Sequence, residues 1–128
     1  RILPASVQAE SMPLLWGVDV LITDYSSMLV DYAVTGRPIV LLAPDLEHYR
    51  RTRGLYVDYD WLSGGRWNGS WDEVLDELRG LCSDPAHRAA AEAHSRRLAA
   101  HFHEFSDGQG SRRVAEAAAA LVADRIRS

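Results

Sequence analysis

The sequence predicts an α/β fold in which a parallel sheet is flanked by helices, and three neighbouring segments carry this prediction. Residues 18–23 (VDVLIT) and 39–42 (IVLL) are short runs of mostly β-branched and aliphatic side chains, which is typical of buried parallel strands. Between them, residues 28–35 carry apolar side chains around most of a helix, which ends before Gly36 and Pro38. A strand, a helix and a second strand in this order form a βαβ unit with parallel strands.

A polar corner, TDYSS at residues 23–27, joins the first strand to the helix. Asp24, Ser26 and Ser27 are all good N-cap residues, and a helix N-terminus favours a bound anion through its free N–H groups and its dipole. The carboxyl ends of parallel strands share one edge of the sheet, where ligands of open α/β folds bind. The corner is therefore either a phosphate site or only a helix cap.

The segment after the second strand brings positive charge to the same edge. Residues 46–52 are expected to form one or two helical turns, and Arg50, Arg51 and Arg53 follow one another closely. Guanidinium groups match the geometry of phosphate oxygens. The alternative is a solvated turn in which the arginines pair with nearby carboxylates, namely those of Asp45, Glu47 and Asp58.

The middle of the chain is predicted to be irregular. Residues 55–59 alternate enough to form a short strand or extended segment, and residues 60–70 form a glycine-rich loop. Trp61 and Trp67 lie in this loop, and Trp71 follows it. Their indole rings could stack on a base, touch an acceptor, lie at a membrane surface, or pack as a lid on the core.

The remainder is predicted to be helical, with helices over 71–81, 85–102 and 111–126 that are capped by Ser70, Asp84 and Ser111. The last helix has an apolar stripe, made of Val114, Ala118, Leu121 and Val122. Three histidines recur every seven residues in the second of these helices, at His87, His94 and His101. Seven helical residues span about 10 Å, too far for one ion, so no metal site is expected.

The start of the chain is expected to hold a short strand over residues 1–9 and a brief helix from a Ser11 cap to Trp16. These would form another βαβ step with the strand at 18–23, in a sheet that continues upstream of Arg1. The chain begins without methionine, so we expect residues 1–128 to be a single domain of a longer protein.

Composition narrows the function classes. The chain has 128 residues, a hydrophobic fraction of 47% and a net charge of -4, which describe one soluble domain and argue against a general nucleic-acid binder. No apolar run approaches the roughly 20 residues of a membrane span. Cys82 is the single cysteine, which fits a reducing compartment, and its apolar surroundings predict a thiol packed in the core.

Four motifs in this order resemble the CDP-glycerol glycerophosphotransferase family, which builds teichoic-acid-like poly(glycerol phosphate) chains. They are TDYSS at 23–27, DLExYR at 45–50, RGLYVDY at 53–59 and DGxxSxRV at 107–114. The resemblance implies a GT-B architecture of two Rossmann-like domains, of which this chain would be the C-terminal, nucleotide-binding one. It implies an enzyme that moves glycerol phosphate from CDP-glycerol to a hydroxyl of a growing chain and releases CMP.

The resemblance also assigns roles by position. Ser26 and Ser27 would hold the donor phosphates, and Asp24 would position a hydroxyl or cap the helix. The other donor-site candidates are Thr23, Tyr25, Asp31, Arg50 and Arg53. His48 is the one candidate for a catalytic base, and the loop DWLSGGRWNG departs from the shorter, proline-containing pattern expected of the family.

The implied partners are the nucleotide-linked donor and, through another domain, a polyol-phosphate acceptor; no cofactor, metal or nucleic acid is expected. The protein would be cytoplasmic, with the full-length enzyme at the inner face of the cell membrane as a peripheral protein. The isolated chain is expected to bind nucleotide without catalysing transfer.

Two rival functions stay open: a GT-B transferase with a different nucleotide-linked donor, and a non-catalytic partner-binding domain of the same fold. A serine hydrolase of the G-x-S-x-G type and a Walker-A ATPase are excluded, because the chain has neither that motif nor any lysine.

Overall fold

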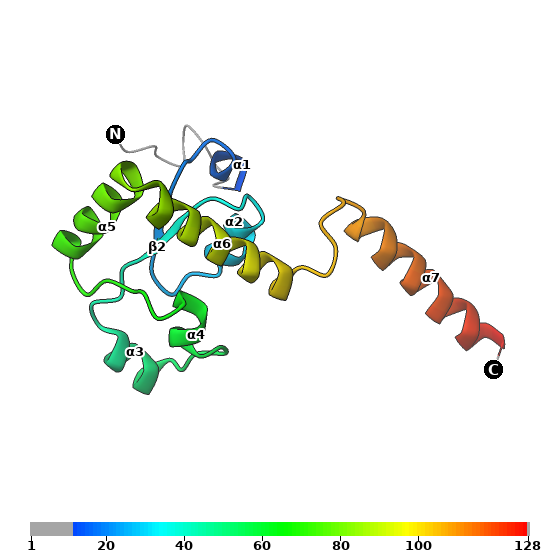
Figure 1. Cartoon of the computed structure of the whole chain (residues 1–128). Helices are drawn as coiled ribbons and strands as arrows, with labels where there is room; N and C mark the ends of the chain where they lie inside the picture. The colour runs from blue at the N-terminus through cyan, green and yellow to red at the C-terminus, as the bar shows by residue number, and fades with distance from the viewer. Residues whose placement is uncertain (1–11, 128) are drawn as a thin grey trace, which may run out of the picture.

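The computed structural model describes residues 12–127, which form a small parallel sheet surrounded by helices (Figure 1). The strands are β1 (Leu21–Thr23) and β2 (Ile39–Leu41). The helices are α1 (Met12–Leu15), α2 (Met28–Ala33), α3 (Leu46–Thr52), α4 (Tyr59–Ser63), α5 (Trp71–Ser83), α6 (Pro85–Phe102) and α7 (Gly110–Arg127). The expected strand at 1–9 and the Ser11 cap lie outside the described residues.

The predicted βαβ unit is confirmed. β1 and β2 pair in parallel, with Leu21 opposite Ile39 and Thr23 opposite Leu41. A third segment continues the sheet beyond β2, because the backbone N–H of Asn68 donates to the Leu41 carbonyl and the N–H of Ala43 donates to the Asn68 carbonyl, both at 2.8 Å. The loop after α4 therefore lies beside β2.

The sheet is covered on both faces by two hydrophobic clusters. Leu29 and Tyr32 of α2 pack with Leu98 of α6 in the larger cluster. Val40 of β2 points the other way and packs with the residues of α5 in the smaller cluster, Val74 and Leu81. Because successive strand residues face opposite sides, β2 contributes Leu41 to the larger cluster and Val40 to the smaller one, whereas Ile22 of β1 stays exposed.

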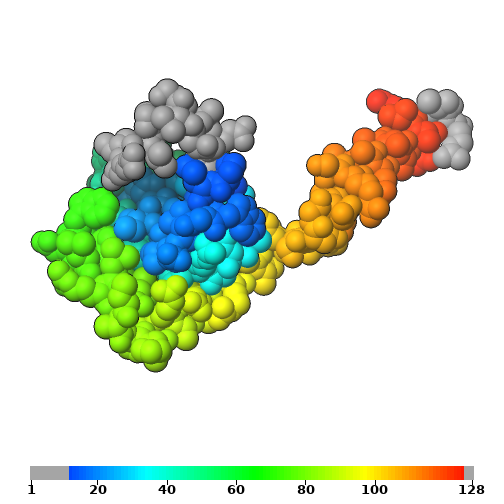
Figure 2. Space-filling model, turned by 90° about the horizontal axis from the view of Figure 1, so that it is seen from above, coloured from blue at the N-terminus to red at the C-terminus, as the bar shows by residue number. Residues whose placement is uncertain are grey.

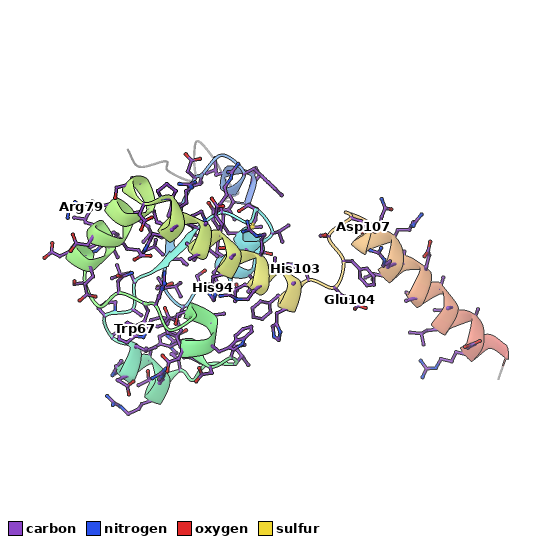
Figure 3. All side chains as sticks on the ribbon, viewed as in Figure 1. Trp67, Arg79, His94, His103, Glu104 and Asp107 are labelled. Atoms are coloured by element: carbon purple, nitrogen blue, oxygen red, sulfur yellow. The ribbon has the colours of Figure 1, made fainter. Side chains whose placement is uncertain are left out.

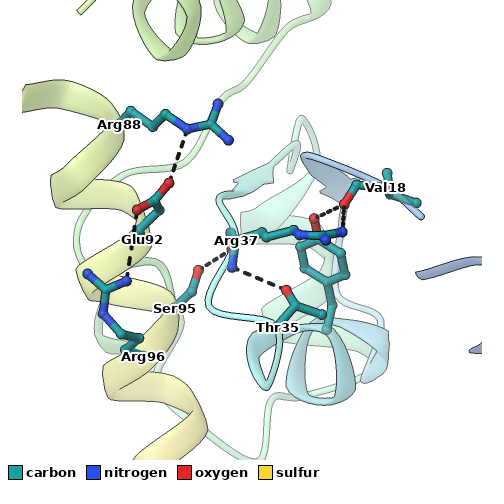
Figure 4. Close-up of polar contacts among 8 residues, drawn as sticks. Val18, Thr35, Arg37, Arg88, Glu92, Ser95 and Arg96 are labelled. Carbon is teal, nitrogen blue, oxygen red and sulfur yellow. Dashed lines mark hydrogen bonds and ion pairs between the residues drawn. The ribbon is translucent and has the colours of Figure 1, made fainter. Parts of the chain in front are cut away.

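Arg37 fixes the connection between α2 and β2 (Figure 4). Its guanidinium donates to the Trp16 carbonyl at 2.8 Å and to the Val18 carbonyl at 2.7 Å, while its own carbonyl accepts from the buried Ser95 hydroxyl at 2.7 Å. The Tyr32 hydroxyl also donates to the Val18 carbonyl. Since these side chains occupy that carbonyl, β1 begins at Leu21 rather than at Val18 as the sequence predicted.

The last helix stands away from the rest of the molecule (Figures 1 and 2). At its start, the Arg113 guanidinium forms a two-point ion pair with Asp107 and lies 3.9 Å from the centre of the Phe105 ring. The apolar stripe expected along α7 is exposed, with Val114 at 70% and Leu121 at 72% of their full exposure.

Three other expectations are corrected. Residues 55–59 form no strand, because Asp58 caps α4 by accepting from the Trp61 N–H at 2.9 Å and Tyr59 begins that helix. Cys82 is exposed rather than packed in the core, since its neighbour Leu81 takes the inward position on α5. Ser111 does not cap α7, which already begins at Gly110.

Candidate functional site: the polar corner and helix α3

The corner at residues 23–27 lies where β1 ends. Two of its side chains accept hydrogen bonds from backbone N–H groups, whereas the Ser27 side chain makes no such bond. The Asp24 carboxylate accepts from the Ser26 N–H at 3.1 Å, and the Ser26 hydroxyl accepts from the Met28 N–H at 3.3 Å. Ser27 occupies the N-cap position of α2, but its side chain makes no capping hydrogen bond and is exposed. Ser27 therefore presents an unengaged hydroxyl at the carboxyl edge of the sheet.

Aromatic side chains join the corner to α3. The Tyr25 ring stacks on Tyr49 of α3, with ring centres 3.8 Å apart and an angle of 19° between the planes. The Tyr25 hydroxyl donates to the Asp45 carboxylate at 2.8 Å. These two contacts hold the start and the middle of α3 against the corner.

Tyr59 of α4 completes this aromatic cluster. Its ring centre lies 5.6 Å from that of Tyr25, and its hydroxyl donates to the Asp24 carbonyl at 3.3 Å. Burial raises the pKa of Tyr59 to about 12, and burial together with the Asp45 carboxylate raises the pKa of Tyr25. Both phenols therefore stay protonated at neutral pH and act as hydrogen-bond donors rather than as bases.

The arginines of α3 divide into engaged and unengaged groups. Arg50 pairs with Glu47 at 2.9 Å and with Asp60 at 3.5 Å. The guanidinium that the sequence offered for phosphate binding is therefore already paired with carboxylates. Arg51 and Arg53 are exposed, and within the described part of the chain neither pairs with a carboxylate. Arg53 forms the end of α3, after the helix that Tyr49 fixes to the corner.

The remaining candidates stand alone. Asp31 lies in the first turn of α2, exposed, and its carboxylate has no hydrogen bond or ion pair with other described residues. His48 is exposed on α3, and its contact is through its backbone carbonyl, which accepts from the Thr52 hydroxyl at 2.8 Å. The structure gives neither side chain a partner that would identify a base.

Sequence reasoning did not connect Trp71 with the corner. An open hollow of about 320 Å³ lies beside it, lined by Thr23, Asp24, Ile22, Leu42 and Trp71. Trp71 begins α5 and keeps 61% of its exposure, so its indole ring forms an apolar wall next to the Asp24 carboxylate. No sequence motif indicates this, because the ring reaches the corner only through the sheet contact of the preceding segment.

Two histidines of α6 and Trp61 contact other side chains of the fold. His87 contacts Glu77 at 2.9 Å, and His101 lies against Trp61 with ring centres 4.5 Å apart. Trp61 thus lies against the end of α6 and keeps 45% of its exposure. In the part of the chain that the structure describes, no group of three or more metal-ligating side chains comes together.

Comparison with known proteins identifies the family. The family described as CDP-Glycerol:Poly(glycerophosphate) glycerophosphotransferase matches residues 1–119. The chain belongs to this family. The motif resemblance seen in the sequence is thereby confirmed.

Relatives with assigned names are teichoic acid enzymes. The chain is 40% identical over 65 residues to the teichoic acid ribitol-phosphate polymerase TarL of Staphylococcus aureus, a match that covers 51% of the chain and 12% of that protein. It is 29% identical over 101 residues to the teichoic acid glycerol-phosphate primase of Bacillus subtilis, covering 79% of the chain and 24% of the primase. The chain thus matches a quarter or less of each of these relatives.

The fold is also that of a solved teichoic acid enzyme. A variant of the wall teichoic acid polymerase TagF superposes with a TM-score of 0.71 at 22% identity, over 97% of this chain and 30% of that one. TagF has a GT-B fold, which confirms the predicted fold class. None of the described helices is both long and apolar enough to cross a membrane.

Proposed function

We propose that this domain binds the nucleotide-linked donor of a teichoic-acid-type transferase at the corner formed by residues 23–27. The enzyme would move glycerol phosphate from CDP-glycerol to a hydroxyl of a growing polyol-phosphate chain and release CMP. The observation that carries this proposal is the unengaged Ser27 hydroxyl at the carboxyl edge of the sheet, next to a helix whose Arg53 is also unengaged. Family membership supplies the reaction class.

The chemistry of the transfer suits such a site. In-line phosphoryl transfer depends on positioned phosphates and on positive charge that compensates the leaving group. Ser27 would hold a phosphate oxygen, and Arg53 and Arg51 would compensate charge on the diphosphate. Arg50 is bound to Glu47 and Asp60, so we assign it the role of orienting α3 instead.

The hollow next to the corner would accept the remainder of the donor. Trp71 would provide an apolar wall, and the Asp24 carboxylate would accept a hydrogen bond from a hydroxyl. Asp24 is already bonded to the Ser26 N–H through one oxygen, which fixes the carboxylate while its other oxygen stays available.

A ribitol-linked donor is the second candidate, because two of the relatives are ribitol-phosphate polymerases of Staphylococcus aureus, at 40% and 38% identity. The polyol part of the donor would then differ while the diphosphate contacts stay the same. The contacts at the corner therefore do not distinguish the two donors, and binding measurements decide which group is transferred.

Calorimetric titration of the 128-residue chain with CDP-glycerol, CDP and UDP tests the proposal. Saturable binding of CDP-glycerol and CDP, with UDP weaker, is expected. A preference for UDP would indicate a transferase with another donor, and no binding of any nucleotide would indicate a partner-binding domain. We also expect no CMP release from CDP-glycerol and a polyol-phosphate acceptor by this chain alone, because a GT-B active site lies between two domains.

A further inference from the structure

A second surface of this chain also displays arginines without carboxylate partners, in a groove that shares no lining residue with the hollow beside the corner. A groove of about 420 Å³ runs between β2, the segment that follows α4, and helices α5 and α6. Its polar lining includes Arg66, Asn68, His94, Arg97 and Glu77, and Trp67 forms part of its wall. In Figure 3, Trp67 and His94 lie in this region, between the lower helices and α6.

Two arginines of the groove lack carboxylate partners, in a chain that is acidic overall. The chain is acidic, and six arginines of the described residues pair with carboxylates, at positions Arg50, Arg79, Arg88, Arg96, Arg112 and Arg113. Within the same residues, Arg66 and Arg97 pair with none, although both are exposed. The carboxylate in the groove, that of Glu77, is bound to His87 at 2.9 Å.

Arg97 is held in place by a neutral histidine. The His94 Nε2 atom lies 2.9 Å from the Leu62 carbonyl, which can only accept, so Nε2 carries the proton. The Nδ1 atom then accepts from the Arg97 guanidinium at 3.1 Å. This bond uses one of the five N–H groups of Arg97, and it orients a guanidinium whose other N–H groups remain available.

Gly64 makes this arrangement sterically feasible. Its φ is +65°, and a Cβ atom placed there would lie 2.8 Å from the His94 ring. The close approach lets the imidazole bond to the Leu62 carbonyl beside the α4 terminus. A side chain at position 64 would displace the ring and, with it, Arg97.

The other side chains of the groove suit a polyol. The Asn68 amide nitrogen donates to the Leu41 carbonyl at 3.0 Å, which leaves the amide oxygen as an acceptor for a hydroxyl. Trp67 keeps 41% of its exposure and offers an apolar face to carbon atoms. Guanidinium groups for phosphate, an amide oxygen for hydroxyls and an indole face for C–H groups are the complement of a polyol-phosphate chain.

We propose that the groove between β2, α5 and α6 binds a phosphodiester unit of the polyol-phosphate chain through Arg66 and Arg97, apart from the donor corner. The volume of the groove lies in the range of about 300–1,000 Å³ that is usual for small-ligand sites. The identification of the ligand as a polyol-phosphate polymer rests on the proposed function, whereas binding of a phosphodiester by the two arginines does not. Such a site would retain the growing polymer near the enzyme.

Titration of the 128-residue chain with a synthetic trimer of glycerol phosphate tests this proposal. Arg66→Ala and Arg97→Ala should each weaken trimer binding by about tenfold to a hundredfold and leave CDP binding unchanged. Arg79→Ala is the matched control, because Arg79 is an exposed arginine on α5 that pairs with Asp76 outside the groove. Gly64→Ala should weaken trimer binding as well, since it displaces His94.

The outcomes separate this site from the donor site. Trimer binding that depends on Arg66 and Arg97 supports the groove even if CDP fails to bind, which would refute the proposed donor site alone. Absence of saturable trimer binding, or equal losses in Arg79→Ala, would overturn the groove proposal. Inorganic phosphate that binds as tightly as the trimer would show a general anion site and overturn the assignment to a polyol chain.

Discussion

Replacing Tyr25 tests whether the aromatic cluster holds α3 against the corner. Tyr25→Phe keeps the stack on Tyr49 but removes the hydroxyl that donates to Asp45 at 2.8 Å. A hydrogen bond to a charged group contributes about 1.5–3 kcal/mol when shielded, and partial exposure of this pair reduces the expected loss to about 1 kcal/mol. Tyr25→Ala also removes the stack, which adds about 0.5–1.5 kcal/mol to the lost burial.

Urea unfolding measures these losses, and the double variant with Asp45→Asn isolates the hydrogen bond. The coupling free energy between positions 25 and 45 should be about 1 kcal/mol, because the two side chains bond directly. Hydrogen exchange of the α3 amides should accelerate in Tyr25→Phe more than that of the α6 amides, since only α3 depends on this bond. A coupling energy near zero with unchanged α3 exchange would refute this role of Tyr25.

Three further outcomes follow from other contacts. The Arg113 hydrogen bond lowers the pKa of Asp107 below its usual 3.8. The ion pair between Arg113 and Asp107 should therefore be intact above pH 3.8 and be lost as the pH falls through the lowered pKa. The loss should be seen as a chemical-shift change that Asp107→Asn abolishes. The pKa of Tyr59 is raised from 10.0 to about 12, so stability should be fully present below pH 10 and fall between pH 10 and 12, less steeply in Tyr59→Phe; an identical alkaline transition would contradict this. Ser95→Ala should lower the free energy of unfolding by about 1–3 kcal/mol, because the Arg37 carbonyl loses its buried donor; an unchanged urea midpoint would refute that contribution.

Local signals predicted the backbone framework well. The runs before Thr23 and after Pro38 gave the parallel strands, and the caps at Ser70 and Asp84 gave the starts of α5 and α6, with their side chains accepting from Glu73 and Ala86 N–H groups. Such signals depend on residues close in the sequence. Propensity and capping act over the same range, so they are readable without the structure.

Contacts between distant residues were not readable in this way. Tyr59 lies in a segment that alternates like a strand, but its burial against the corner and the cap at Asp58 make it helical. The pairing of Tyr25 with Tyr49 and the position of Trp71 beside the corner likewise join separate segments. Of the donor-site candidates, the structure brings the residues of the corner together with α3. Arg50 pairs with Glu47, which the sequence offered as the alternative to phosphate binding by the arginines.

The most direct test of the donor site measures the stability and the CDP binding of variants in the corner and in α3. Ser26→Ala removes the hydrogen bond to the Met28 N–H and should lower stability by about 1 kcal/mol, whereas Ser27→Ala removes no intramolecular bond and should leave stability unchanged. Calorimetry should show that Ser27→Ala and Arg53→Ala each weaken CDP binding by about tenfold to a hundredfold, and cytidine binding by less. Added salt should weaken CDP binding further. Unchanged CDP affinity in both folded variants would contradict the claim that the corner and α3 bind the donor diphosphate.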